Sequence, residues 1–349
     1  MNISNTKIFI LYSDSKSFKK ITMSQVSNSE IIDQIVAGAV QDQAAKAPGL
    51  RQAHAKSHGC VWGELAIADN IPENLQVGIF SKVKTYPIWA RFSNASGPLS
   101  QGQLQSDKNP DGRGFAIKVL QVEGKKVLED EPNAQDFVLI NHPVFFVREA
   151  QDYIRLAEVT AGKLPPETLA YEFGILQQIA GKKTLNPSEI QYWSATPYRL
   201  GTQAIKFSAK PQVINTADLP IPDSDHYLRA ALVNTLTIEK RDVYFDFLIQ
   251  LQSDSDPKWV DDPTLLWDEN ISPYIKVATI KIPAQEFDNS DRKQFDESLS
   301  FTPWHTLPEH EPLGSVNASR LKLYKTIAQN RREHNQQVIT EPQPYAIQS

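Results

Sequence analysis

The chain has 349 residues, of which 40% are hydrophobic and 22% are charged, a composition typical of a soluble globular protein. The formal net charge is −5, from 36 basic and 41 acidic side chains, and the sequence contains no basic block. Nucleic acid is therefore not an expected partner. A single cysteine, Cys60, excludes an intrachain disulfide. This fits a reducing compartment, so we expect a cytoplasmic protein.

The chain is expected to form one main domain with loose ends. An apolar run close to the N-terminus is too short to span a membrane, so we expect no transmembrane segment. Residues 1–22 are interpreted as a flexible extension, and residues 23–337 as the folded domain. Residues 338–349 contain Pro342 and Pro344 and are expected to form a loose tail.

Helical and strand patterns occur in separate blocks along the chain. The predicted elements, in chain order, are a helix over residues 31–40, strands over 86–93, 114–122 and 137–140, two helices within 150–182 broken at Pro165-Pro166, strands over 231–238, 243–252 and 276–282, and a helix over 318–334. Because helices and strands do not alternate, the order predicts an α+β fold, in which helices surround an antiparallel sheet or barrel.

Several common catalytic patterns are absent from the sequence. It contains no glycine-rich phosphate loop, no His-Glu-x-x-His helix, no cysteine pair for zinc and no Gly-x-Ser-x-Gly elbow. The usual motifs of dinucleotide-binding proteins and metal hydrolases therefore do not explain the unusual polar clusters in this chain.

The first cluster contains two histidines between residues 51 and 59. His54 and His58 are four residues apart and would share a helical face, where they could bind a metal. Pro48 and the flanking glycines make a long helix doubtful, so a polar loop is the simpler interpretation of this cluster alone.

Two further clusters place polar residues inside apolar runs. Arg91 lies within the predicted strand over residues 86–93, where a guanidinium needs a buried anion or carboxylate as its partner. Asn141 and His142 interrupt the apolar run that begins at Phe137, and buried polar groups at these positions also require partners.

The last predicted helix carries an arginine one turn before a tyrosine. Because residues four apart are neighbours on a helix, the Arg320 guanidinium can reach the Tyr324 phenol oxygen. Arg331 follows Tyr324 by seven residues and lies on the same face. On its own, this pattern is also that of an ordinary amphipathic helix.

Taken in order, these clusters strongly resemble the motifs of the catalase-like haem family. The matching segments are Arg51–Lys56, Arg91–Ser93, Asp111–Lys118, Asn141–Arg148, Pro303–Trp304 and Arg320–Tyr324. The resemblance implies an antiparallel β-barrel of the catalase type with surrounding helices. It also implies a ferric haem b cofactor with Tyr324 as the proximal iron ligand, supported by Arg320.

The same resemblance assigns roles to other residues. His54 is expected to be the catalytic base on the distal face of the haem. Arg51, Arg91 and Arg331 match positions that hold the haem propionates. Beyond these, Ser93 is expected to support His54, and Asp111 to lie in the access channel.

One departure from the family pattern concerns the distal amide. Larger catalases carry two successive asparagines here, and the first of them is the catalytic partner of the histidine. In this chain Ile140 occupies the first position and only Asn141 remains, so Asn141 is the candidate catalytic amide.

Three functions follow as alternatives. The first is a haem oxidoreductase of the catalase or peroxidase type, which decomposes hydrogen peroxide or organic hydroperoxides through an oxoferryl intermediate. The second is rearrangement of fatty-acid hydroperoxides, as in the allene oxide synthase-like branch. The third is a barrel that binds haem or an apolar ligand without turnover. The expected partners are haem and a peroxide or lipid hydroperoxide, and a homo-oligomer is left open.

Overall fold

The computed structural model describes residues 28–214, 219–253, 256–338 and 340–345. The extension expected over residues 1–22 lies outside this part of the chain. Within the described part, no helix combines the length and the apolar character needed to cross a bilayer.

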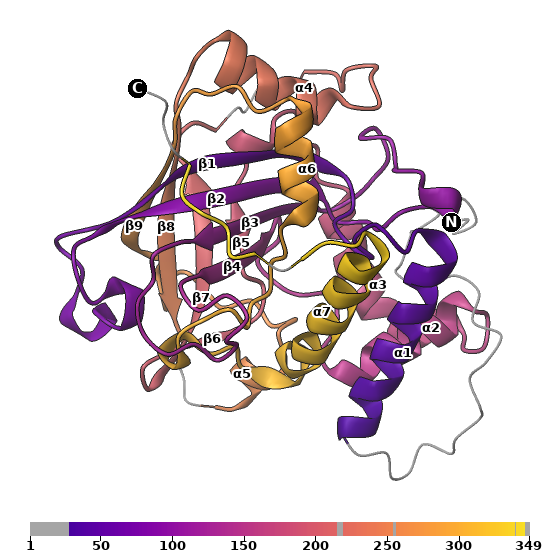
Figure 1. Cartoon of the computed structure of the whole chain (residues 1–349). Helices are drawn as coiled ribbons and strands as arrows, with labels where there is room; N and C mark the ends of the chain where they lie inside the picture. Colours follow the sequence, from indigo (N-terminus) through magenta and orange to yellow (C-terminus); the bar gives the residue numbers. More distant parts are fainter. Residues whose placement is uncertain (1–27, 215–218, 254–255, 339, 346–349) are drawn as a thin grey trace.

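A closed antiparallel barrel forms the centre of the molecule (Figure 1). Its strands are β1 Ser57–Ile67, β2 Thr85–Asn94, β3 Arg113–Val119, β4 Gln135–Ile140, β5 Tyr192–Trp193, β7 Gln203–Pro211, β8 Val243–Leu251 and β9 Ile275–Ile282. The strand order is β5-β4-β3-β2-β1-β9-β8-β7, and the pairing of β5 with β7 closes the ring. The short β6, Tyr198–Leu200, pairs antiparallel with the first residues of β7. The predicted α+β barrel architecture is confirmed.

Aromatic and aliphatic side chains fill the inside of the barrel, and the polar residues of the predicted site lie on its outer face. Phe92 and Phe115 stack with their ring centroids 4.5 Å apart, and Phe115 lies 5.0 Å from Phe245 across the barrel. Because side chains of a strand alternate between its two faces, Arg91 and Ser93 project outward on either side of the inward-facing Phe92.

Helices cover the outer face. They are α1 Asn28–Lys46, α2 Ala150–Thr160, α3 Ala170–Ala180, α4 Tyr227–Val233, α5 Lys258–Asp261, α6 Ser290–Ser298 and α7 Gly314–His334. Figure 1 shows α1, α2, α3 and α7 gathered on one side of the barrel. The predicted break between the second and third helices is present, because a short 3₁₀ turn, Pro166–Leu169, starts at the proline pair.

One predicted strand is wrong. Residues 231–238 are rich in β-branched side chains, yet they form the end of α4 and a π-helical turn over Asn234–Ile238. The physical reason is an apolar stripe with helical spacing. Leu228, Leu232 and Leu236 are four residues apart and completely buried, so packing against the barrel outweighs the strand propensity. The sequence patterns also missed β7 and α6.

Part of the tail that was expected to be loose is docked on the barrel. The Trp89 indole donates a hydrogen bond of 2.9 Å to the carbonyl oxygen of Gln343. The ring of Tyr345 stacks on Trp62, with centroids 5.3 Å apart. Aromatic burial of this kind stabilises an otherwise irregular segment, and it could not be inferred from the two prolines.

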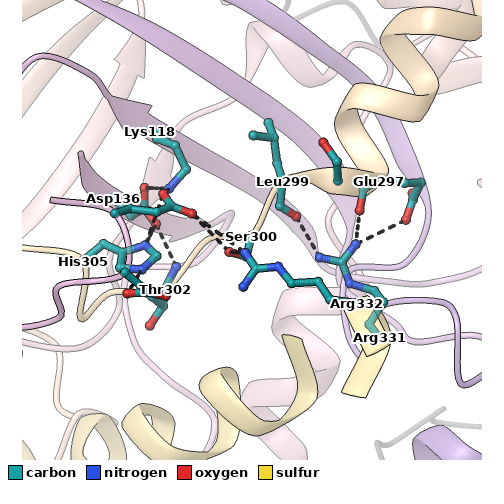
Figure 2. A network of polar contacts seen from close by, with 12 residues as sticks. Lys118, Asp136, Glu297, Leu299, Ser300, Thr302, His305, Arg331 and Arg332 are labelled. Carbon is teal, nitrogen blue, oxygen red and sulfur yellow. Dashed lines mark hydrogen bonds and ion pairs between the residues drawn. The ribbon is translucent and has the colours of Figure 1, made fainter. Parts of the chain in front are cut away.

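A network of buried charges ties β3 and β4 to the segment that precedes α7 (Figure 2). The Lys118 ammonium pairs with Glu131 and, at 2.7 Å, with Asp136. The two ring nitrogens of His305 each donate to a carboxylate, Nδ1 to Asp136 and Nε2 to Asp130, at 2.9 Å in both cases. Burial and Lys118 lower the pKa of His305, but these carboxylates outweigh them and raise it to about 9.

This raised pKa makes a stability prediction. A histidine whose pKa is about 9 in the folded chain and 6.5 in the unfolded chain stabilises the fold fully below pH 6.5. That contribution is lost as the pH rises through 9. We expect His305→Gln to lower the free energy of unfolding at pH 6 by up to about 3 kcal/mol. Urea unfolding should show this difference between the two proteins shrinking toward zero by pH 10. A difference that does not change with pH would contradict the assignment.

Candidate functional site

A cavity of about 470 Å³ lies outside the barrel, between β2–β4 and helices α3 and α7. Segments that are far apart in the sequence meet at its walls. The predicted site residues that line it are Arg51, His54, Arg91, Ser93, Asp111, Arg320, Tyr324 and Arg331. The structure therefore brings together every predicted site residue except Asn141.

His54 is held in the cavity wall by the segment that joins α1 to β1. Its backbone has φ 56°, a left-handed conformation that is uncommon for a side chain other than glycine and is often found at functional sites. Its backbone N–H donates to the carbonyl oxygen of Ala95 at 2.9 Å. The ring Nδ1 lies 3.0 Å from the Ser93 hydroxyl, so Ser93 supports His54 as expected.

The alternative of a histidine pair on one helical face is wrong. Residues 51–56 are not helical, and β1 begins at Ser57. The His58 ring is completely buried and bonds to the Asn94 side chain at 2.8 Å. His58 does not line the cavity that His54 faces.

His54 is neutral at physiological pH. Burial and the positive charges of Arg91, Arg320 and Arg51 lower the pKa of His54 to about 3. A neutral ring with one nitrogen engaged by Ser93 leaves the other nitrogen, Nε2, available to exchange a proton in the cavity.

Tyr324 enters the cavity from α7 and is bonded to an arginine, as the helical spacing predicted. The Arg320 Nη2 donates to the Tyr324 phenol oxygen at 3.0 Å. Although burial lowers it, the phenol oxygens of Tyr324 and Tyr198 raise the pKa of Arg320 above its ordinary value. The permanent guanidinium charge makes Arg320 a strong, fixed hydrogen-bond donor to this oxygen.

The Pro303–Trp304 segment helps to fix the helix that carries Tyr324. The Trp304 indole donates to the carbonyl oxygen of Asn317 at 2.8 Å, within the first turn of α7. The Asn317 side chain in turn accepts a hydrogen bond from Arg320 at 3.0 Å. A motif distant from the cavity is thereby connected to the arginine beside Tyr324.

Three arginines, of which Arg91 and Arg331 are buried and Arg51 is partly buried, converge at one end of the cavity. Arg91 Nε bonds to the Asp296 carboxylate at 2.6 Å, and Arg51 Nη1 to the Glu297 carboxylate at 3.0 Å. Arg331 donates to the carbonyl oxygen of Leu299 at 2.8 Å, as Figure 2 shows. We call Arg51, Arg91 and Arg331 the arginine cluster.

The two acidic partners at the end of α6 were not identified from the sequence. A signal for one of them was present, because an arginine inside an apolar strand needs a buried anion or carboxylate as its partner, and Asp296 is that partner of Arg91. What the sequence lacked was any pattern that would indicate which of its 41 acidic residues this is.

The arginine cluster carries more positive charge than its two carboxylates neutralise. Burial and the nearby charge of Arg51 lower the pKa of Arg331 to about 9. Burial and Arg91 likewise lower the pKa of Arg51. Lowered arginine pKa values indicate incomplete compensation, so this end of the cavity favours an additional anionic group.

Asp111 lies in the cavity wall near Ser96. Its carboxylate accepts a hydrogen bond of 2.9 Å from the Ser96 hydroxyl. Burial raises the pKa of the Asp111 carboxyl above its ordinary value.

Asn141 is not among the residues that line the cavity. Its side-chain oxygen accepts the backbone N–H of Arg113 at 2.9 Å, and its nitrogen donates to the carbonyl oxygen of Ile179 at 3.4 Å. The amide is therefore used to join the ends of β3 and β4. Ile140 lines the cavity instead, so this wall presents an apolar side chain beside His54.

Gly114 makes room for the histidine. A Cβ atom at this position would lie 2.5 Å from Nδ1 of His54 and 2.8 Å from the Ser93 hydroxyl oxygen. Real Cβ atoms essentially never approach other atoms so closely, and the two neighbours are hydrogen-bonded to each other at 3.0 Å. The glycine of the Asp111–Lys118 motif thus has a direct steric function.

Comparisons with known proteins agree with this architecture. The catalase family model matches residues 16–172. A fungal catalase has 19% sequence identity and a TM-score of 0.64, covering 96% of this chain and 68% of its own. Catalase A from Saccharomyces cerevisiae has 19% identity and a TM-score of 0.62, with 91% and 68% covered. A bacterial catalase has 17% identity and a TM-score of 0.62, with 95% and 67% covered. No curated protein sequence matches the chain.

The barrel and its outer helices define a protein with the catalase fold. The catalase family model matches residues 16–172, which is less than half of the chain, and the described residues share the fold of the solved catalases, so the chain resembles the catalase-like superfamily in sequence and in fold.

The steric function of Gly114 can be tested without any ligand. We expect Gly114→Ala to lower the free energy of unfolding by about 1–3 kcal/mol, because the added methyl group displaces His54 and Ser93. The matched control is Gly174→Ala in α3, where a Cβ meets nothing within 4 Å. That variant should gain about 0.5–1 kcal/mol from helix propensity. Equal effects of the two changes in urea unfolding would show that the tight packing around Gly114 is not real.

Proposed function

We propose that the cavity binds haem b and that the protein processes hydroperoxides as a haem oxidoreductase of the catalase or peroxidase type. The observation that carries this proposal is the pairing of two side chains in one cavity. A neutral histidine, His54, and a tyrosine bonded to a guanidinium, Tyr324, both line it. A passive binding site would need no such base.

The residues present fit a haem group. Apolar side chains, among them Ile140, Phe146 and Leu323, supply surfaces for an apolar macrocycle. The arginine cluster lies at one end of the cavity and has unneutralised positive charge, which suits two propionates. Tyr324 supplies the phenol oxygen that would ligate the iron, and Arg320 donates a hydrogen bond to it.

The proton chemistry falls to His54. When bound, haem supplies the redox-active iron at which the oxygen–oxygen bond of a hydroperoxide is cleaved. His54 Nε2 accepts the hydroperoxide proton and returns it to the departing oxygen. Ser93 holds Nδ1 and thereby keeps the ring oriented for both transfers. The low pKa of His54 keeps the ring unprotonated before each cycle.

A second candidate function is rearrangement of a lipid hydroperoxide. The observation that favours it is the apolar wall beside His54, where Ile140 and Ile179 take the place of an amide donor. Such a wall suits an acyl chain better than hydrogen peroxide. In this case His54 moves the same proton, but the hydroperoxide is converted to an allene oxide and water, and no oxygen is released.

One experiment separates these functions. The purified protein, reconstituted with haem, is mixed with hydrogen peroxide and, separately, with a fatty-acid hydroperoxide. Oxygen release from the first supports catalase-type decomposition. Formation of an allene oxide, or of an epoxide isomeric with the substrate, from the fatty-acid hydroperoxide supports rearrangement. No turnover of either would contradict enzymatic function and leave a binding protein.

If Tyr324 is the iron ligand, removing its phenol oxygen should abolish the haem absorption spectrum. We expect the protein to show the absorption spectrum of ferric high-spin haem, and Tyr324→Phe to lose it, because phenylalanine has no oxygen for the iron. Tyr244→Phe is the control, since Tyr244 lies on β8 and is 36% exposed. Haem content and spectrum that are normal in Tyr324→Phe would refute Tyr324 as the ligand.

The role of His54 predicts a separable effect. We expect His54→Ala to keep haem and its spectrum, yet to lose about 10²–10⁴-fold in turnover of hydroperoxide, the usual contribution of a positioned acid–base group. Steady-state rates and haem content measured on the same samples check this. Unchanged turnover would remove the proton-transfer role.

A further inference from the structure

Three oxidisable aromatic side chains contact one another on the outer face of the barrel. Trp62 on β1 and Trp89 on β2 are direct cross-strand neighbours. Tyr345 stacks on Trp62, with ring centroids 5.3 Å apart and planes at 15°. It also meets Trp89 edge to face, with centroids 6.0 Å apart. Tryptophan and tyrosine are the protein side chains that most readily give up a single electron near neutral pH.

The buried end of this aromatic cluster reaches the cavity wall. Trp89 and Arg91 project from the same face of β2, roughly 7 Å apart along the strand. Trp89 packs on Phe295 at 4.5 Å between centroids, and the next residue, Asp296, holds Arg91. Trp89 and Phe301 belong to one apolar cluster, and Phe301 lines the cavity. Packed side chains therefore connect Trp89 with the cavity continuously.

The other end of the cluster reaches solvent. Trp89 is only 4% exposed, whereas Tyr345 is 45% exposed. Hydrogen bonds hold the segment of Tyr345 in place, from the Trp89 indole to Gln343 and from the Asn133 side chain to Glu341 at 3.0 Å. The aromatic contact is therefore anchored at several points.

The charge of Arg292 affects which of the aromatic side chains is more stable in its oxidised form. Its guanidinium lies over the rings of Trp89, at 4.7 Å, and Tyr345, at 5.0 Å. A fixed positive charge disfavours a radical cation on tryptophan. It does not disfavour a tyrosine that loses an electron and its phenolic proton together, because the product is neutral. The oxidised state is therefore more stable on Tyr345 than on Trp89.

We propose that Tyr345, with Trp62, is a second oxidation site, at which phenols or aromatic amines too large for the cavity are oxidised. Trp89 carries the electron from this surface site to the cavity. The inference rests on the proposed function, since the peroxide reduced in the cavity is the electron acceptor.

The reaction balances for a phenol donor. One hydroperoxide takes up two electrons and two protons, its oxygen–oxygen bond breaks, and an alcohol and water form. In each of two steps Tyr345 gives an electron by way of Trp89 and its phenolic proton to water. A donor phenol then breaks its own O–H bond, restores the Tyr345 hydroxyl and leaves as a phenoxyl radical. Two phenols are oxidised for each hydroperoxide reduced.

The test uses the haem-loaded full chain, hydrogen peroxide and a phenol coupled to dextran, which cannot enter a cavity of about 470 Å³. The variants are Tyr345→Phe, which keeps the stacked ring but removes the phenol, and Trp89→Phe, which interrupts the relay. Tyr244→Phe, which removes an exposed phenol on β8, is the matched control. A second readout does not depend on turnover: a nitroso spin trap is added with peroxide, and the labelled residues are located by peptide mass spectrometry.

We expect oxidation of the dextran-bound phenol to be lost in Tyr345→Phe and in Trp89→Phe and retained in Tyr244→Phe. The spin-trap adduct should lie on Tyr345 in the parent protein and disappear from it in Trp89→Phe. Oxidation and adducts that are the same in all three variants would overturn the relay, and the aromatic cluster would then only anchor the tail. A parent protein that consumes no hydroperoxide would instead refute the proposed function, so the two failures are distinguishable.

Discussion

The burial of the arginine cluster beside an apolar barrel is the constraint on which the rest of the cavity depends. An unpaired guanidinium at such a place is costly, and breaking a buried ion pair typically costs about 3–5 kcal/mol. The chain meets this constraint with Asp296 and Glu297 at the end of α6. It also uses the backbone carbonyl of Leu299, which accepts from both Arg51 and Arg331. Helices α6 and α7 are therefore positioned relative to β2 by charge as well as by packing.

The segment that follows α6 is held in its turn by charges behind it. Arg332 bonds to the Ser300 hydroxyl at 2.5 Å, and the backbone N–H of Thr302 donates to Asp136 at 2.9 Å (Figure 2). His305 and Lys118 balance the carboxylates of this region. The cavity thus has a rigid polar support on one side and a rigid aromatic core on the other. Rigid support of this kind is what the proton-transfer role proposed for His54 would require.

The sequence predicted the barrel architecture and most of the residues that line the cavity, but not the distant partners of those residues. The spacing of Arg320 and Tyr324 was enough to predict their contact, because both residues lie on one helix and the contact depends only on the helical period. The order of the motifs brought His54 and Ser93 to the same cavity. By contrast, Asp296 reaches Arg91 across more than 200 positions of the chain, and no local pattern indicates such a partner.

The wrong predictions share one physical cause. Tertiary packing outweighed the local conformational preferences on which the predictions were based. Residues 231–238 have strand propensity, but the leucine stripe of α4 makes the helix more favourable. Tyr345 lies after two prolines, yet two tryptophans on neighbouring strands provide a surface for it.

The most direct measurement of the central claim, that the cavity holds haem with Tyr324 on the iron, is the resonance Raman spectrum of the haem-loaded protein. Excitation into the phenolate-to-iron charge-transfer band should enhance the ring modes of a coordinated tyrosinate. Those modes should shift when the protein is grown on ring-deuterated tyrosine. A spectrum of histidine- or water-ligated haem, insensitive to the tyrosine label, would contradict the account.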